Sequence, residues 1–257
     1  MSTLENFTGA LMSGAIKTID LTHTLDPEFP VLVLPPEFGQ CAPFKIEEVS
    51  RYDERGPAWY WRNFSCNEHT GTHFDAPVHW VTGKDIPNAS VDTLAPENFV
   101  RPACVMDFSK EVAADEDFVL TADHIKAWEA EHGDIPANHW VLFRTDWSKR
   151  SGAEYLNLRD DGAHSPGPGT EAVRYLVETR DVLGFGVETI GTDAGQGGAF
   201  DPPYPAHTLL HGAGKFGLQC LRNLDQLPPT GALIVSPPLK IKEGSGSPLR
   251  VLALVEN

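Results

Sequence analysis

The sequence has few basic residues and no cluster of them. Lysine and arginine together number 20, against 36 aspartates and glutamates, which gives a formal net charge of −16 at pH 7. Nucleic acids and anionic membrane surfaces are bound through clustered lysines and arginines. We therefore expect neither a nucleic-acid partner nor a membrane partner for this protein.

Long apolar runs and closely spaced cysteine pairs are also missing. No stretch approaches the roughly 20 apolar residues of a membrane span, and the N-terminus lacks the basic and apolar blocks of a secretory signal. Cys41, Cys66, Cys104 and Cys220 lie far apart, so a cysteine zinc site is not expected. Their spacing leaves two disulfides open, but a reduced, cytoplasmic protein is the simpler interpretation for a chain with ample core.

The composition is typical of a folded domain, because 41% of the 257 residues are hydrophobic and 22% are charged. Hydrophobic periodicity and capping residues predict helices at 3–13, 121–132 and 171–179, and partly over 206–224. Strands are predicted at 18–25, 44–50, 58–66, 102–108, 139–145, 231–235 and 249–255, and within 181–190. The segment 156–168 is expected to be a loop. Since no repeat or linker divides the chain, we expect one α/β domain over residues 1–257 with a mixed sheet.

One eleven-residue stretch, His69-Thr-Gly-Thr-His-Phe-Asp-Ala-Pro-Val-His79, concentrates histidine and carboxylate. Gly71 and Pro77 both oppose a continuous helix. A fully extended chain would separate His69 from His73 by roughly 13 Å, whereas ligand atoms lie about 2.0–2.2 Å from a metal. We therefore expect the chain to bend at Gly71, where left-handed backbone conformations are least costly.

This stretch predicts a divalent metal site with a proton-transfer group beside it. Asp75 lies two residues beyond His73 and so on the same face of a strand. Two imidazoles and a carboxylate are a common ligand set for a catalytic divalent metal. His79 exceeds that set, and we interpret it as the general acid/base. The alternative is that some of these histidines are ordinary hydrogen-bonded structural residues.

Aromatic residues flank the histidine stretch on both sides. Trp59, Trp61 and Phe64 lie in the predicted strand that precedes it, and Trp80 follows His79 directly. They either pack a core or stack on a planar substrate. Asp193, in a glycine-rich segment, is equally well explained as a carboxylate near the site or as a surface or capping residue.

The pattern His-x-Gly-Thr-His-x-Asp-x-Pro-x-His closely resembles the signature of the cyclase-like metal-dependent amidohydrolase family. That family includes kynurenine formamidases and isatin hydrolases. Residues 20–23, 121–135 and the region from Gly191 onward are similar as well. The resemblance implies a swivelling β/β/α architecture and a homodimer or larger homo-oligomer.

The resemblance also implies the ligand set. In the formamidase branch a first metal would take His69, His73 and Asp75. A second would share Asp75 and add a histidine, which maps to His207, and a glutamate from a C-terminal helix.

The glutamate position holds Gln219, a neutral amide that favours a second ion less. The chain therefore resembles the isatin hydrolase branch more closely, with one manganese ion and Gln219 as a fourth ligand. His207 and His211 would then be pocket residues or simply structural ones. Zinc is the alternative ion, because the donors permit either and raw affinity favours zinc.

The reaction implied by the resemblance is hydrolysis of a small aromatic cyclic amide, isatin, to isatinate. The metal would polarise a carbonyl or activate a water, and His79 would accept a proton and return it to the leaving nitrogen. One alternative is an arylformamidase that acts on N-formylkynurenine with two metals. A weaker alternative is a non-catalytic metal-binding or ligand-binding protein.

Overall fold

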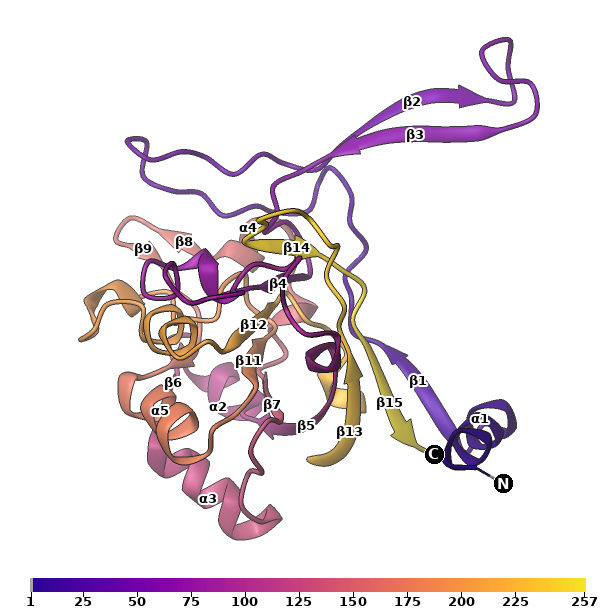
Figure 1. Ribbon diagram of the computed structural model, residues 1–257. Coiled ribbons are helices and arrows are strands. Elements are labelled where there is room, and N and C mark those ends of the chain that lie inside the picture. The colour runs from indigo at the N-terminus through magenta and orange to yellow at the C-terminus, as the bar shows by residue number, and fades with distance from the viewer. Residues whose placement is uncertain (1) are drawn as a thin grey trace.

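A mixed sheet organises residues 2–257, the part of the chain that this computed structural model describes. Across that range nine strands pair in the order β1 (Ile16–Asp20), β15 (Leu252–Glu256), β13 (Thr230–Val235), β5 (Val100–Asp107), β7 (Trp140–Arg144), β11 (Gly184–Val187), β12 (Phe216–Gln219), β4 (His73–Asp75) and β14 (Gly246–Pro248). The four strands from β5 to β12 are parallel, and the pairings outside them are antiparallel. The expected α/β domain with a mixed sheet is confirmed (Figure 1).

Alternate residues of the central strands belong to two apolar cores on opposite faces of the sheet. Trp140 and Leu142 of β7 join one core, whereas Val141 and Phe143 join the other. This division follows from the two-residue period of a strand, and burial of both strand faces is typical of parallel sheets covered on each side. The second core includes the apolar sides of helices α3 (Ala122–His132) and α5 (Thr170–Arg174).

Local capping signals define the longest helix of the second core. Thr121 caps α3 through its side chain and Gly133 ends it, as the sequence predicts. The predicted helix at 171–179 is α5 continued by a π-helical turn, Tyr175–Thr179. The other helices are α1 (Thr3–Ser13), α2 (Ser109–Ala114) and α4 (Gly152–Leu156). Within residues 2–257, no helix has both the length and the apolar character needed to cross a membrane.

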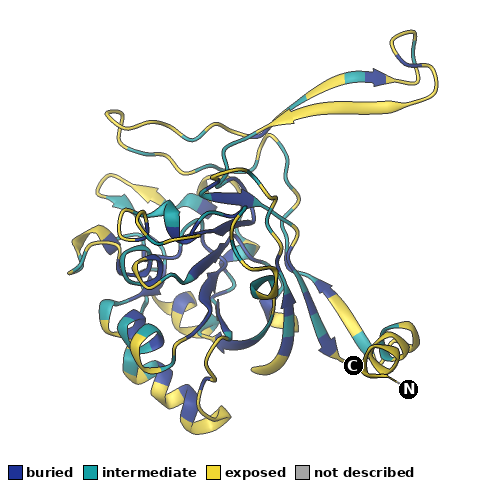
Figure 2. Cartoon of the chain, in the orientation of Figure 1, coloured by how far each residue is buried: buried dark blue, intermediate teal, exposed yellow. Residues whose placement is uncertain are grey.

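A two-stranded arm extends away from the body of the molecule (Figure 1). It consists of β2 (Lys45–Arg51) and β3 (Tyr60–Ser65), and every residue of β3 is exposed. Figure 2 shows the contrast between this arm and the buried central sheet. The aromatic run predicted as a strand is therefore a strand, but its side chains are not part of the core in this chain.

Two predictions are wrong in detail. The predicted loop 156–168 contains short strands, β8 (Leu158–Arg159), β9 (Gly162–Ala163) and β10 (Gly167–Pro168), the last of which pairs with β6 (Val119–Leu120). The segment 206–224 holds only a π-helical turn, Ala206–His211, before it becomes strand β12. Two-residue strands carry too short a pattern to be recognised, and β12 is held by pairing with distant strands rather than by a local signal.

Candidate metal centre

The bend predicted at Gly71 folds the histidine stretch back on itself. Gly71 has a φ of +65°, and a Cβ there would lie 3.0 Å from Leu25 Cδ1. The chain then enters β4, where His73 and Asp75 are both buried. The expected bend is confirmed, and it brings His69 Nδ1 to 2.7 Å from Asp75 Oδ1.

Hydrogen bonds leave one ring nitrogen of His73 directed at Asp75. Its Nδ1 lies 2.7 Å from the Gly71 carbonyl oxygen, to which it can only donate. Its Nε2 is then the acceptor nitrogen, 3.5 Å from Asp75 Oδ1. His69, His73 and Asp75 are thus brought together as the sequence predicts.

Gln219 reaches the same carboxylate from strand β12, not from the helix that the sequence analysis expected. Antiparallel pairing of β12 with β4 sets Gln219 opposite His73. Its Nε2 donates to Asp75 Oδ2, and its Oε1 is buried without a partner among residues 2–257. A buried carbonyl oxygen without a donor is costly, and a bound cation would satisfy it.

Two further histidines approach Asp75 from the π-helical turn. The Nε2 atoms of His207 and His211 each lie 3.9 Å from Asp75 Oδ2. The Nδ1 of His207 lies 2.5 Å from Asp193, and the Nδ1 of His211 lies 3.0 Å from the Lys215 carbonyl. Buried Asp193 contacts a histidine of the site, and it also caps the π-helical turn by accepting from the backbone N–H groups of Ala206 and His207, so both of the roles left open for it agree with its contacts. His211 was expected to be a pocket or structural residue rather than a metal donor, and its Nε2 is buried without a partner in the described chain.

His79 lies over His69 at the end of the next turn. The ring centroids are 3.9 Å apart, and Pro77 begins the single 3₁₀ turn that ends at His79. Burial lowers the pKa of His79 to about 3 and outweighs the opposing effect of Asp75. His79 is therefore neutral near pH 7.

The charge at the centre of the cluster belongs to Asp75. Burial alone would raise its pKa, but His79 and His69 outweigh that effect and hold the pKa well below its usual value. Ligand atoms come within 4.8 Å of one another in two groups that share Asp75. One group is His69, Asp75 and His79, and the other is Asp75, His207 and His211. The donors are imidazole and carboxylate, which suit a divalent transition metal.

Only part of the predicted substrate pocket lies near this cluster. Trp80 is 4.7 Å from His207 between ring centroids, and its Nε1 donates to Thr208. Tyr204, which the sequence analysis missed, lies 5.8 Å from Trp80. The rings of Trp80, Tyr204 and His207 form an aromatic wall beside the histidines. Trp59, Trp61 and Phe64 lie instead on the extended arm, 45%, 57% and 66% exposed.

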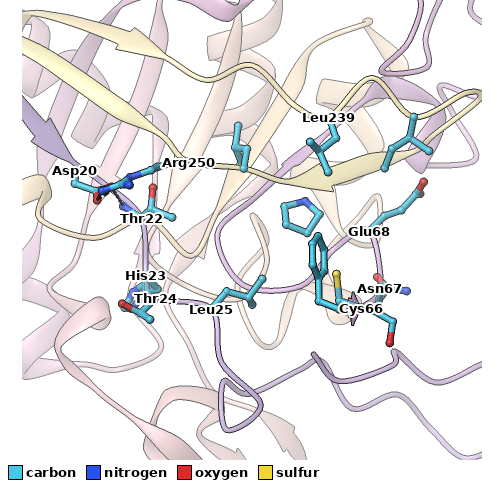
Figure 3. A pocket seen from close by; sticks show the side chains of 15 residues that line it. Asp20, Thr22, His23, Thr24, Leu25, Cys66, Asn67, Glu68, Leu239 and Arg250 are labelled. Atoms are coloured by element: carbon cyan, nitrogen blue, oxygen red, sulfur yellow. Dashed lines mark hydrogen bonds and ion pairs between the residues drawn. The ribbon is translucent and has the colours of Figure 1, made fainter. Parts of the chain in front are cut away.

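A groove of about 640 Å³ lies beside the metal centre rather than over it. Figure 3 shows Glu68 and Leu239 on its wall, with Asp20 and Arg250 at the other end. His23 also lines it, with Nε2 buried and unpartnered among residues 2–257. Phe64 lines the groove at the base of the arm, so the arm and the groove are continuous.

The Cyclase family model, described as "Putative cyclase", matches residues 19–194. An isatin hydrolase from Roseibium aggregatum is 51% identical over 257 residues, covering 99% of this chain and 97% of that protein. The structure is similar to isatin hydrolase A from Labrenzia aggregata bound to benzyl benzoate, with a TM-score of 0.99, 64% identity and complete coverage of both chains. It is also similar to an isatin hydrolase bound to the product analogue thioisatinate, with a TM-score of 0.97, 49% identity and complete coverage of both chains.

Proposed function

This chain belongs to the cyclase family, and we propose that it is a single hydrolase domain that converts isatin to isatinate. The observation that carries the proposal is the convergence of imidazole and carboxylate donors on Asp75, with neutral His79 beside them. The similarity to a structure holding a product analogue of this reaction supports the same substrate.

The residues fit a divalent ion, and His69, His73, Asp75 and Gln219 would hold it. Two acceptor atoms support this fit: the unpartnered Oε1 of Gln219 and the Nε2 of His73, which faces Asp75. When bound there, such an ion would supply polarisation of a carbonyl oxygen and a lowered pKa for a water molecule. We propose manganese, with zinc as the alternative, because nitrogen and oxygen donors accept both.

The chemistry assigned to the chain itself is proton transfer and orientation. His79, neutral at pH 7, accepts a proton from the attacking water as oxygen bonds to the lactam carbonyl carbon. The same imidazole returns that proton to the ring nitrogen as the carbon–nitrogen bond breaks. The product then carries a carboxylate and an aromatic amine. Trp80 and His207 would orient the planar substrate from the aromatic wall.

The arm suggests that the protein forms a homodimer or larger homo-oligomer. An isolated two-stranded ribbon is marginally stable in water, and the arm presents Trp59, just before β3, and Trp61 and Phe64 of β3 to solvent. A second copy is the simplest cover for these aromatic side chains. The arm residues would then belong to an intersubunit surface and could reach the substrate of a neighbouring chain.

The competing function is an arylformamidase with two metals. It is favoured by one observation, the second donor group of Asp75, His207 and His211. Hydrolysis of isatin and of N-formylkynurenine should be measured side by side, with manganese-loaded and chelator-treated protein and metal analysis of each sample. We expect fast, chelator-sensitive opening of isatin with one ion per chain. Preferential deformylation with two ions per chain would replace the proposal with the formamidase.

A further inference from the structure

The loop before strand β14 (Gly246–Pro248) touches the outer side of His69. Ser245 Oγ lies 2.9 Å from His69 Nε2, although the two residues are 176 positions apart in the chain. The same hydroxyl donates to Glu68 at 2.7 Å, and the Ser245 backbone N–H donates to Glu68 at 3.1 Å. These contacts form a chain of hydrogen bonds, Glu68–Ser245–His69, that ends at the metal centre.

The direction of each bond follows from the number of available protons. A serine hydroxyl has one proton, and a carboxylate only accepts. Because Ser245 gives its proton to Glu68, its oxygen must accept from His69 Nε2–H. The other ring nitrogen of His69, Nδ1, then faces the metal site, 2.7 Å from Asp75 Oδ1.

The backbone of the same segment is shaped around both side chains. A Cβ on Gly246 would lie 2.6 Å from His69 Cε1 and 2.5 Å from the Phe74 carbonyl oxygen. A Cβ on Gly244 would lie 3.0 Å from Glu68 Oε1. Glycine at both positions therefore lets the loop close onto the ring and the carboxylate.

We propose that Glu68 and Ser245 are positioning residues that fix His69 with Nδ1 toward the bound metal. The inference rests on the metal site proposed above and adds two residues to it. Hydrogen-bond partners behind a metal-binding histidine fix its tautomer and orientation, and their loss weakens metal affinity about 10–100-fold. Glu68 also lines the groove of Figure 3, so this support lies at the boundary between the groove and the metal centre.

The test is the dissociation constant of Mn²⁺ for full-length apo protein, measured by competition with a chromogenic chelator. Ser245→Ala should raise that constant about 10–100-fold. Ser245→Thr keeps the hydroxyl and should restore tight binding. Ser247→Ala is the matched control, because Ser247 is buried in the adjacent strand and bonds to Leu239 and Pro248 instead. Its metal affinity should remain that of the wild type.

A second variant provides the test if Ser245→Ala does not fold. Glu68→Gln should give an affinity between those of wild type and Ser245→Ala, because a neutral amide oxygen is a weaker acceptor. If Ser245→Ala folds and binds Mn²⁺ with wild-type affinity, the positioning role is overturned but the metal site is not. If Ser245→Ala does not fold, wild-type affinity in Glu68→Gln has the same meaning. Failure of the wild-type protein to bind Mn²⁺ or Zn²⁺ would instead overturn the proposed metal site.

Discussion

At the scale of single residues, the histidines of the cluster differ in how firmly their rings are held. His73 and His207 each donate from Nδ1 to a fixed acceptor, the Gly71 carbonyl and Asp193. His79 instead stacks against His69 and faces the aromatic wall. A ligand benefits from a fixed ring, whereas an acid/base must exchange protons with the substrate.

His79→Ala should therefore lower the turnover number for isatin by about 10²–10⁴-fold while the metal content stays unchanged. Steady-state kinetics and elemental analysis of the same preparation would measure both quantities. His139→Ala is a suitable control, because the half-exposed His139 side chain lies outside the cluster and bonds to the Ala137 carbonyl. Loss of the metal in His79→Ala would make His79 a ligand and remove it from the acid/base role.

Gln219 is the residue expected to set the number of ions. Gln219→Glu would place a second carboxylate against Asp75 in a buried site, and two such charges require a cation between them. We expect the variant to bind two ions per chain and, without metal, to unfold at a lower temperature than the wild type. Gln226→Glu adds the same charge at an exposed position and should change neither quantity. A single ion per chain in Gln219→Glu would show that the residue does not determine stoichiometry.

Sequence reasoning was most effective for residues that are close along the chain. His69, His73 and Asp75 could be predicted because one bend at Gly71 brings them together. Ser245 could not, since its contact with His69 joins segments 176 residues apart and carries no pattern of its own. His211 was also missed as a donor, because a π-helical turn rather than an α-helix directs it to Asp75.

At the scale of elements, too, features with a local sequence signal could be predicted and features that depend on long-range contacts could not. Helix α3 was predicted with its N-cap because Thr121 and Gly133 are local signals. Strand β12 was taken for helix, because only its pairing with β11 and β4 makes it a strand. The two strands of the arm were predicted. Their exposure could not be, because it depends on what the arm packs against, and the sequence pattern does not contain that information.

The arm provides a prediction about assembly. Trp61→Ser combined with Phe64→Ser removes two exposed aromatic rings from β3, and we expect the homo-oligomer to dissociate into monomers. Light scattering coupled to size-exclusion chromatography would give the mass. Leu158→Ser is the control, because Leu158 is 51% exposed on the separate β8–β9 hairpin. An unchanged mass in the double variant would show that the arm does not hold the assembly together.

His164, which follows the β8–β9 hairpin, forms hydrogen bonds to two carboxylates. Its Nδ1 is 2.6 Å from Asp117 and its Nε2 is 2.9 Å from Asp161. Hydrogen bonds to Asp117 and then Asp161 raise the pKa of His164, against opposing effects of burial and, to a smaller extent, of Arg159. A raised native pKa means that the folded protein binds this proton more tightly than the unfolded chain does. The stabilisation is therefore complete below about pH 6.5 and is lost as pH rises through the native pKa.

The melting temperature of His164→Asn should accordingly fall furthest below that of the wild type near pH 6. The difference should shrink as the pH is raised toward 9. Thermal unfolding of the two proteins at a series of pH values would measure this. His139→Asn, on the surface, should show a difference that does not change with pH. A His164→Asn difference that grew with pH would contradict the assigned hydrogen bonds.

At the scale of the whole molecule, the metal centre lies toward one edge of the sheet and shares its strands with a core. The ligands come from β4, β12 and the turns beside them, and in the same strands Phe74 and Leu218 alternate with the ligands and belong to the first core. The sequence could predict the α/β class and the motif, but the order of strands that brings β12 and β14 to either side of β4 is a long-range property.

Removal of the metal should therefore loosen one edge of the sheet without unfolding the molecule. An ion at 100 times its dissociation constant stabilises the folded state by about 2.7 kcal/mol. For a chain of this size each kcal/mol shifts the melting temperature by about 2–4 °C. We expect chelation to lower the melting temperature by about 5–10 °C, with an unchanged far-ultraviolet circular dichroism spectrum at 25 °C.

Asp75→Asn, which removes the charge at the centre of the site, should melt at the same temperature with or without chelator. A loss of secondary structure on chelation would make the ion a structural staple, and an unchanged wild-type melting temperature would show that no ion is bound.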